Sequence, residues 1–335
     1  MRIVYAPDSY GGFLSAPAAC RLVRRVLGLR GLAIELHPMA DGGEGTTQVL
    51  RHHGVAEALE VVETASLLGP VCADMEGPWQ QRSSQALGRR LAQPGGGPLV
   101  VGLGGTATMD GGAGALQALG LILRSERGRA LPAGLRGGEL AQVARVQGPM
   151  PLRGRLVELL CDVSSPLLRA PELYGPQKGM SELEVARQGK VFAGWAAVLG
   201  HWRQEQGLDP LPLDLPGGGA AGGLGFALAC VGARPAPGAR RVGRLTGLAA
   251  RLKGADAVVI GEGRLDRTSF EGKVAQVVLR EARQHGVPRV LALVGQARWS
   301  PPAPLGPDAI VQAGEPTLEA FLAAIEALGA ELARS

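Results

Sequence analysis

The feature that most constrains the fold of this 335-residue chain is an arrangement that recurs along it. Short apolar runs that resemble strands end in turns of small and acidic residues, and helix-like stretches follow. The expected strands are residues 2–6, 33–39, 98–101, 156–161, 255–260 and 288–295. Strands that alternate with helices are typical of an α/β protein with a mainly parallel sheet. Residues 58–76 interrupt this order, because their alternation predicts an antiparallel hairpin.

Acidic residues lie in the turns after five of these strands. They are Asp8, Asp41 with Glu44, Asp110, Asp162, and Glu262 with Asp266. Parallel α/β sheets bind ligands at the carboxyl ends of their strands. Each turn alone is better explained by the ordinary turn chemistry of Asp and Gly. The five together favour one shared site for a metal ion and phosphates.

The glycine-rich stretch 102–114 follows the strand expected at 98–101 and leads into a helix. Such a turn can offer backbone N–H groups to a phosphate. We expect the backbone of Gly104, Gly105 and Thr106 to face phosphate. Gly111 and Gly112 have no side chains, so we expect the backbone N–H groups beside Asp110 to be accessible as well. Asp110 itself is interpreted as a metal ligand or base, or as a helix cap.

The remaining motifs favour metal-assisted phosphoryl transfer. No histidine lies within a glycine-acid turn, and neither a G-x-S-x-G elbow nor a Walker motif is present. Lys178 and Lys273 stand in glycine-flanked turns, where each can contact phosphate or solvent. Arg264 lies between Glu262 and Asp266, where it can hold a substrate carboxylate or neutralise its neighbours.

Composition excludes several other classes of function. The net charge is +5, but the arginines are scattered and aromatic residues are 4%, so nucleic-acid binding is not expected. No apolar stretch is long enough to cross a bilayer, and the first residues do not resemble a signal peptide. We therefore expect a cytoplasmic enzyme with reduced cysteines.

Seven stretches occur in the same order as in the bacterial type I family of glycerate kinases, which the chain therefore resembles. They are residues 6–9, 39–46, 102–114, 161–163, 174–179, 217–225 and 261–266. The resemblance implies phosphorylation of D-glycerate by ATP to 2-phosphoglycerate, with Mg²⁺. It also implies a Rossmann-like parallel-sheet domain, residues 1–55 and 225–335, with an inserted second α/β domain, residues 56–224. The active site would then lie in the cleft between them, and a homodimer is compatible with this family.

Within that reading, each candidate residue receives a role. Asp8, Asp41 and Asp266 are unranked candidates for the base, and Arg264 and Lys273 complete the catalytic set. ATP is assigned to Gly104, Gly105, Thr106, Gly111, Gly112 and Lys178, and the metal to Asp110, Glu44 and Asp162.

The chain departs from the family pattern in two segments. Residues 8–12 read Asp-Ser-Tyr-Gly-Gly, so Gly11 stands where the family usually has lysine, and residues 75–98 are shorter than usual. Two alternatives follow: a kinase for another small hydroxy acid or polyol, and a non-catalytic regulator that binds nucleotide or glycerate.

Overall fold

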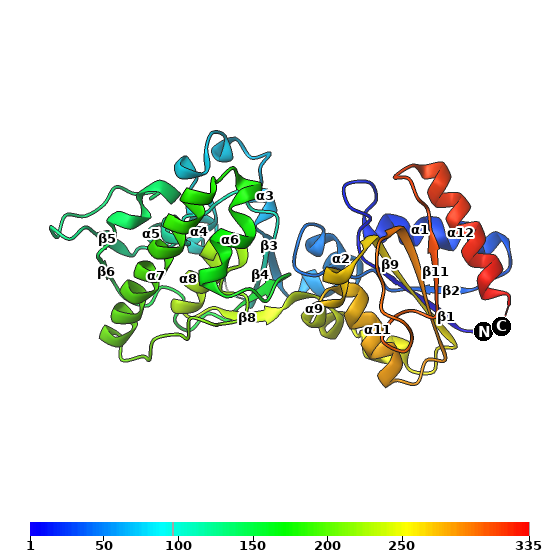
Figure 1. Cartoon of the computed structure of the whole chain (residues 1–335). Helices are drawn as coiled ribbons and strands as arrows, with labels where there is room; N and C mark the ends of the chain where they lie inside the picture. Colours follow the sequence, from blue (N-terminus) through cyan, green and yellow to red (C-terminus); the bar gives the residue numbers. More distant parts are fainter. Residues whose placement is uncertain (96, 335) are drawn as a thin grey trace. The chain divides into compact units, whose positions relative to one another are not determined.

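The computed structural model describes residues 1–95 and 97–334, which form two compact units. Unit 1 combines Met1–Asp41 and Gly45–Glu57 with the chain from Gly238 onward. Unit 2 consists of Gly42–Glu44 and Ala58–Pro237. Figure 1 shows this composition by colour, since blue and orange-to-red segments share unit 1. Each unit is an α/β structure built on parallel strands, which confirms the expected fold class.

Unit 1 is built on a parallel sheet with strand order β11-β10-β9-β1-β2. The strands are β1 (Ile3–Pro7), β2 (Ile34–Leu36), β9 (Ala257–Leu265), β10 (Arg289–Ala297) and β11 (Ala309–Gln312). The helices are α1 (Ala16–Leu29), α2 (Thr46–His52), α9 (Gly238–Thr246), α10 (Leu248–Leu252), α11 (Val274–Gln284) and α12 (Leu318–Leu332), with short 3-10 turns at Val55–Glu57 and Arg267–Phe270.

Helices cover both faces of this sheet, which explains why β1 is buried along its whole length. On one face Ile3 and Tyr5 pack with Val23 of α1 and Phe321 of α12. Alternate residues point the other way, and Val4 is equally buried on the face that α11 covers. The continuous apolar runs in the sequence are therefore those of a parallel sheet buried on both sides.

Unit 2 has a second parallel sheet with strand order β3-β4-β7-β8, and a separate antiparallel pair β5-β6. The strands are β3 (Glu60–Glu63), β4 (Leu99–Leu103), β5 (Ile122–Arg124), β6 (Arg145–Gln147), β7 (Val157–Cys161) and β8 (Arg234–Pro237). The helices are α3 (Ala65–Leu68), α4 (Gln85–Ala92), α5 (Ala113–Ala118), α6 (Ala170–Tyr174), α7 (Glu182–Glu205) and α8 (Leu224–Cys230). Short 3-10 turns lie at Ala73–Met75, Trp79–Gln81, Gly137–Gln142, Leu167–Arg169, Pro176–Lys178 and Ala220–Gly223.

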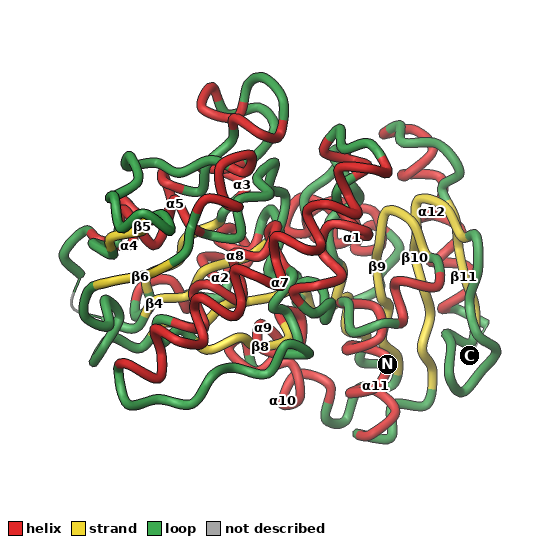
Figure 2. The backbone as a smooth tube through the Cα atoms, turned by 60° about the vertical axis from the view of Figure 1, so that its left-hand side comes forward, coloured by secondary structure: helices red, strands yellow, loops and turns green. Residues whose placement is uncertain are grey.

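Two expectations differ from the structure in this unit. The antiparallel hairpin over 58–76 is wrong: β3 pairs in parallel with β4, Val61 opposite Val100, and a helix, α3, follows at Ala65. Figure 2 shows α3 in the colour of the helices. Alternation along a strand defines its two faces but not its partner. Residues 225–237 were expected with the chain ends, yet they belong to unit 2, because β8 pairs in parallel with β7.

Within the described residues, no helix is long and apolar enough to cross a membrane.

Candidate active site

Unit 1 contains a cavity of about 420 Å³ at the carboxyl ends of β1 and β9. Its position agrees with the rule that parallel sheets bind ligands at this edge. The lining residues are Asp8, Ser9, Tyr10, Gly11, Asp41, Glu262, Gly263, Arg264, Asp266, Thr268 and Lys273. All five residues predicted to be catalytic therefore line one cavity.

Strand register places Asp8 beside Glu262. Pro7 at the end of β1 pairs with Gly261 of β9, and the N–H of Asp8 donates to the Gly261 carbonyl at 2.8 Å. Gly263 allows the turn after β1 to approach β9 closely, because a Cβ there would lie 2.9 Å from the backbone nitrogen of Gly11. An acidic residue of the turn after β1 and one within β9, which the sequence analysis expected in a turn, thus become neighbours.

The Asp8 carboxyl is a group whose pKa is raised well above its ordinary value. Burial is the main cause of the raised pKa, and the negative charges of Asp41 and Glu262 raise it further. The hydrogen bond from the Ser9 N–H and the positive charge of Lys273 lower it in part. Burial likewise raises the pKa of Glu262 to about 7. Carboxyls shifted toward neutrality in a cavity are typical of proton-transfer sites.

Glu262 also has an incomplete set of hydrogen bonds. Its Oε2 is buried and has no hydrogen-bond partner among the described residues. A buried carboxylate oxygen left in this way costs free energy unless a ligand, water or ion occupies the space beside it. The cavity therefore contains a carboxyl group, that of Glu262, whose pKa is raised and whose Oε2 accepts no hydrogen bond from the described residues.

Asp266 differs from Asp8 because its carboxylate is already engaged. Its Oδ1 accepts hydrogen bonds from the N–H and hydroxyl of Thr268 at 2.9 and 2.7 Å, and its Oδ2 accepts one from Arg264 Nε at 2.9 Å. These bonds, led by that from the Thr268 hydroxyl, lower the pKa of Asp266. A carboxylate held ionised in this way is a weak base, so the geometry ranks Asp8 above Asp266.

In unit 2, Asp110 is completely buried and its carboxylate serves the loop itself. Oδ2 accepts hydrogen bonds from the N–H of Ser84 at 2.8 Å, the Ser84 hydroxyl at 2.6 Å and the N–H of Gly114 at 3.2 Å. Oδ1 accepts one from the N–H of Gly112 at 3.1 Å. This arrangement does not fit the metal assignment of Asp110, because in this conformation its oxygens are occupied by four donors and closed to solvent, and the carboxylate holds the loop instead.

The glycine loop exposes less backbone than its sequence indicates. The N–H of Gly111 donates to the Gly222 carbonyl, that of Gly112 to Asp110, and that of Gly104 to the Thr64 hydroxyl. These three amides are therefore not available to a phosphate in this conformation. Gly105 is exposed and Thr106 half-buried, and their N–H groups make no hydrogen bond within the part of the chain described.

Three more predicted residues lie in unit 2. Lys178 Nζ donates to the Thr108 carbonyl at 2.8 Å, and burial lowers its pKa to about 8 against the opposing effect of Asp110. Asp162 follows β7 beside Gly104, where a Cβ would lie 3.6 Å from the Asp162 Oδ2. Glu44 is exposed. Among the described residues no group of three or more acidic, histidine or cysteine side chains is arranged to hold a metal ion.

Two residues without an assigned role prove important in the structure. Glu262 was visible as an acidic strand end, and its buried Oε2, which has no hydrogen-bond partner among the described residues, distinguishes it from its neighbours in the structure. Ser84 comes from the shortened segment 75–98, and its hydroxyl also accepts the N–H of Ala115 at 2.9 Å. No local pattern identifies Ser84, because its partners lie on the other side of β4 in the sequence.

Comparisons with known proteins agree across almost the whole chain. The model of the "Glycerate kinase family" matches residues 3–88 and 86–321. A "Glycerate kinase" of Halalkalibacterium halodurans is 34% identical over 337 residues, covering 88% of this chain and 85% of that protein. A "Glycerate 2-kinase" of Escherichia coli is 31% identical, with coverage of 88% and 85%. The crystal structure of a "putative glycerate kinase 2" from Salmonella typhimurium LT2 matches with a TM-score of 0.78 and 30% identity, covering 100% of this chain and 98% of that one.

Proposed function

Because the chain belongs to the glycerate kinase family, a family of phosphotransferases, we propose that it transfers the γ-phosphate of ATP to D-glycerate, with Mg²⁺, to form 2-phosphoglycerate. The observation that carries the chemical part of this proposal is the raised pKa of Asp8 in the acidic cavity of unit 1. Asp8 accepts the proton of the attacking hydroxyl, and the neighbouring negative charges strengthen it as a base.

Glycerate is a small anion, and the cavity offers cations to hold its carboxylate. Arg264 is exposed, and its Nε is paired with Asp266 while its Nη groups make no hydrogen bond within the described residues. A guanidinium of this kind suits a carboxylate, which it can bind through two parallel hydrogen bonds. We assign Arg264 and Lys273 to substrate binding, with Asp41 as a second acidic wall of the cavity.

The nucleotide phosphates are assigned to the exposed tip of the glycine loop at Gly105 and Thr106, with Lys178 beside it. Asp110 keeps the loop in shape. Oxygen ligands suit Mg²⁺, which commonly binds one or two carboxylates together with substrate phosphates rather than an all-protein cage. Asp162 and Glu44 would hold it, and when bound it neutralises phosphate charge during transfer.

The test measures ADP release on adding D-glycerate, ATP and Mg²⁺, for the wild type and two variants. We expect Asp8→Asn to lower kcat about 10²–10⁴-fold, the usual worth of a general base. Asp214→Asn is the matched control, because Asp214 is exposed and outside the cavity. Near-normal turnover of Asp8→Asn would contradict the role of Asp8.

Substrate choice is tested in the same assay. Gly11 lines the cavity where the family usually has lysine, so other small hydroxy acids are compared with D-glycerate. Faster turnover of another acid would favour a kinase of different specificity, and tight binding without ADP release would favour a regulator. Phosphorus NMR of the product distinguishes 2-phosphoglycerate from its 3-isomer.

A further inference from the structure

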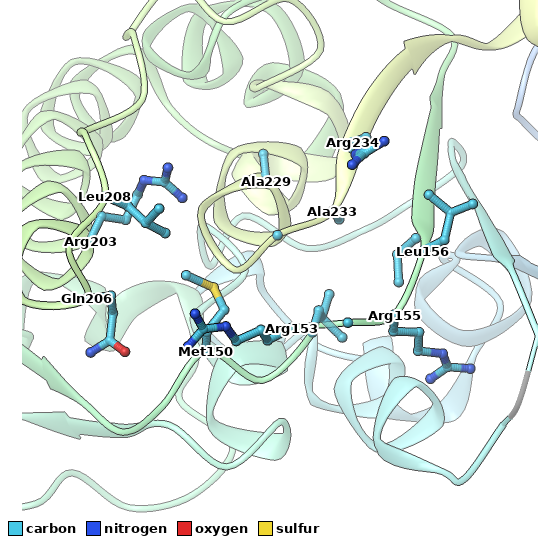
Figure 3. A pocket seen from close by; sticks show the side chains of 14 residues that line it. Met150, Arg153, Arg155, Leu156, Arg203, Gln206, Leu208, Ala229, Ala233 and Arg234 are labelled. Atoms are coloured by element: carbon cyan, nitrogen blue, oxygen red, sulfur yellow. The ribbon is translucent and has the colours of Figure 1, made fainter.

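A second cavity, of about 570 Å³, lies in unit 2 and is lined by four arginines. Arg153 and Arg155 precede β7, Arg203 is near the end of α7, and Arg234 begins β8. Figure 3 shows Arg153, Arg203 and Arg234 around the opening, together with the apolar Met150 and Leu208, while the Arg155 side chain points away from it. No acidic residue is among the residues that line it.

This cavity is at the opposite edge of the sheet from the glycine loop. Arg155 and Arg234 stand at the amino ends of the parallel strands β7 and β8, whereas the loop follows the carboxyl end of β4. Five-residue strands such as β4 and β7 span about 15 Å, at about 3.3 Å per residue. The arginine cavity is therefore separate from the residues assigned to phosphate in this unit.

Two of the four arginines are occupied by the fold. Arg155 is paired with Glu60 at 2.9 Å and donates to the Leu91 carbonyl at 2.8 Å, although its buried Nε has no hydrogen-bond partner among the described residues. Arg203 donates to the carbonyls of Asp209 and Cys230, each at 2.7 Å. The Cys230 carbonyl ends α8, so this bond also covers the negative end of a helix dipole.

The other two arginines are not held by an ion pair within the described residues, although Glu158 stands opposite Arg234 in the register of β7 and β8. Arg153 and Arg234 are exposed, and neither side chain makes a hydrogen bond or ion pair within the described part of the chain. Two unpaired guanidinium groups at one opening raise the local concentration of anions. Guanidinium also offers paired N–H donors that match phosphate oxygens.

We propose that this cavity binds a small phosphate ester with a partly apolar body. The phosphate would contact Arg153 and Arg234, and the body would lie against Met150, Leu152 and Leu208, with Gln206 as a polar partner. The cavity volume is in the range of small-molecule sites, which combine apolar walls with a few polar groups. The inference does not depend on the proposed kinase reaction.

The experiment measures binding of phenyl phosphate by isothermal titration calorimetry. The pocket variant is Arg153→Gln with Arg234→Gln, and the control is Arg127→Gln with Arg129→Gln. Both pairs are exposed in unit 2 and remove the same charge, and neither removes an ion pair. We expect the Kd of the pocket variant to rise at least about tenfold, with no change in the control.

Citrate and inorganic phosphate are the comparison ligands. Weaker binding of both than of phenyl phosphate supports a phosphate ester with an apolar body, and tighter binding of citrate overturns that ligand class. Binding that is equal in the pocket variant and the wild type places phenyl phosphate elsewhere and overturns the site. Absence of saturable binding to the wild type also overturns it.

Discussion

Replacing Ser84 by alanine tests whether the buried Asp110 network holds unit 2 together. The hydroxyl is completely buried, donates to Asp110 Oδ2 at 2.6 Å and accepts the N–H of Ala115 at 2.9 Å. Ser84→Ala removes both bonds, and no water can replace them without a rearrangement. The change should therefore disturb the glycine loop at two points.

The two losses set the expected magnitude. A hydrogen bond to a charged group is worth about 1.5–3 kcal/mol, and a buried N–H left unpaired costs about 1–3 kcal/mol. The backbone N–H of Ser84 still donates to Asp110, so the carboxylate keeps part of its stabilisation. We expect the free energy of unfolding of unit 2 to fall by about 3–5 kcal/mol, which lowers its Tm by about 10 °C.

The assay is urea unfolding followed by circular dichroism, without nucleotide or Mg²⁺. Ser83→Ala is the control, because Ser83 is only half-buried and its hydroxyl accepts a single bond, from the N–H of Gln85 at 3.2 Å. That change should cost about 1 kcal/mol or less. Equal stability of the two variants would refute the reasoning. So would a loss for Ser84→Ala seen only with Mg²⁺ present, because it would return Asp110 to a metal-binding role.

Three further predictions concern unit 1. Glu262→Gln removes a negative charge that raises the pKa of Asp8, so the acidic limb of the pH profile of kcat/KM should move to lower pH. An unmoved limb would show that the charge of Glu262 does not act on the base. Gly263→Ala should raise KM for glycerate and destabilise unit 1 by about 1–3 kcal/mol, because its Cβ would meet the backbone of Tyr10 and Gly11. Gly12→Ala is the control, because a Cβ at this position has open space around it. This change should alter neither KM in steady-state kinetics nor the stability of unit 1 in thermal unfolding. Hydrogen bonds from Arg2 and Arg251 lower the pKa of Glu35 to about 2. The ionised Glu35 side chain therefore stabilises the protein fully above about pH 4.5, and this stabilisation declines as the pH falls toward 2. Glu35→Gln should therefore cost less than about 1 kcal/mol at pH 7, because the side chain is 35% exposed, and the difference should shrink in acid unfolding curves.

Much of the fold and of the acidic cavity could be predicted from local patterns. Apolar runs such as 2–6 and 255–260 are buried strands. The rule that ligands bind at the carboxyl ends of parallel strands predicted that Asp8, Asp41 and Asp266 lie together, and all three line one cavity. The motifs from residue 6 to residue 266 identified the family, and the comparisons confirm it. These conclusions depend on periodicity and on order along the chain, and both are properties of the sequence alone.

The differences among chemically similar residues were decided by the tertiary structure. Asp8, Asp110 and Asp266 are equivalent acidic turn residues in the sequence. Folding buries Asp8 beside two other acids, surrounds Asp110 with four donors and pairs Asp266 with Arg264 and Thr268. Likewise, alternation over 58–76 could not reveal that β3 would pair with β4. Burial, hydrogen-bond partners and strand pairing depend on residues distant in the chain, so they exist only once the protein is folded.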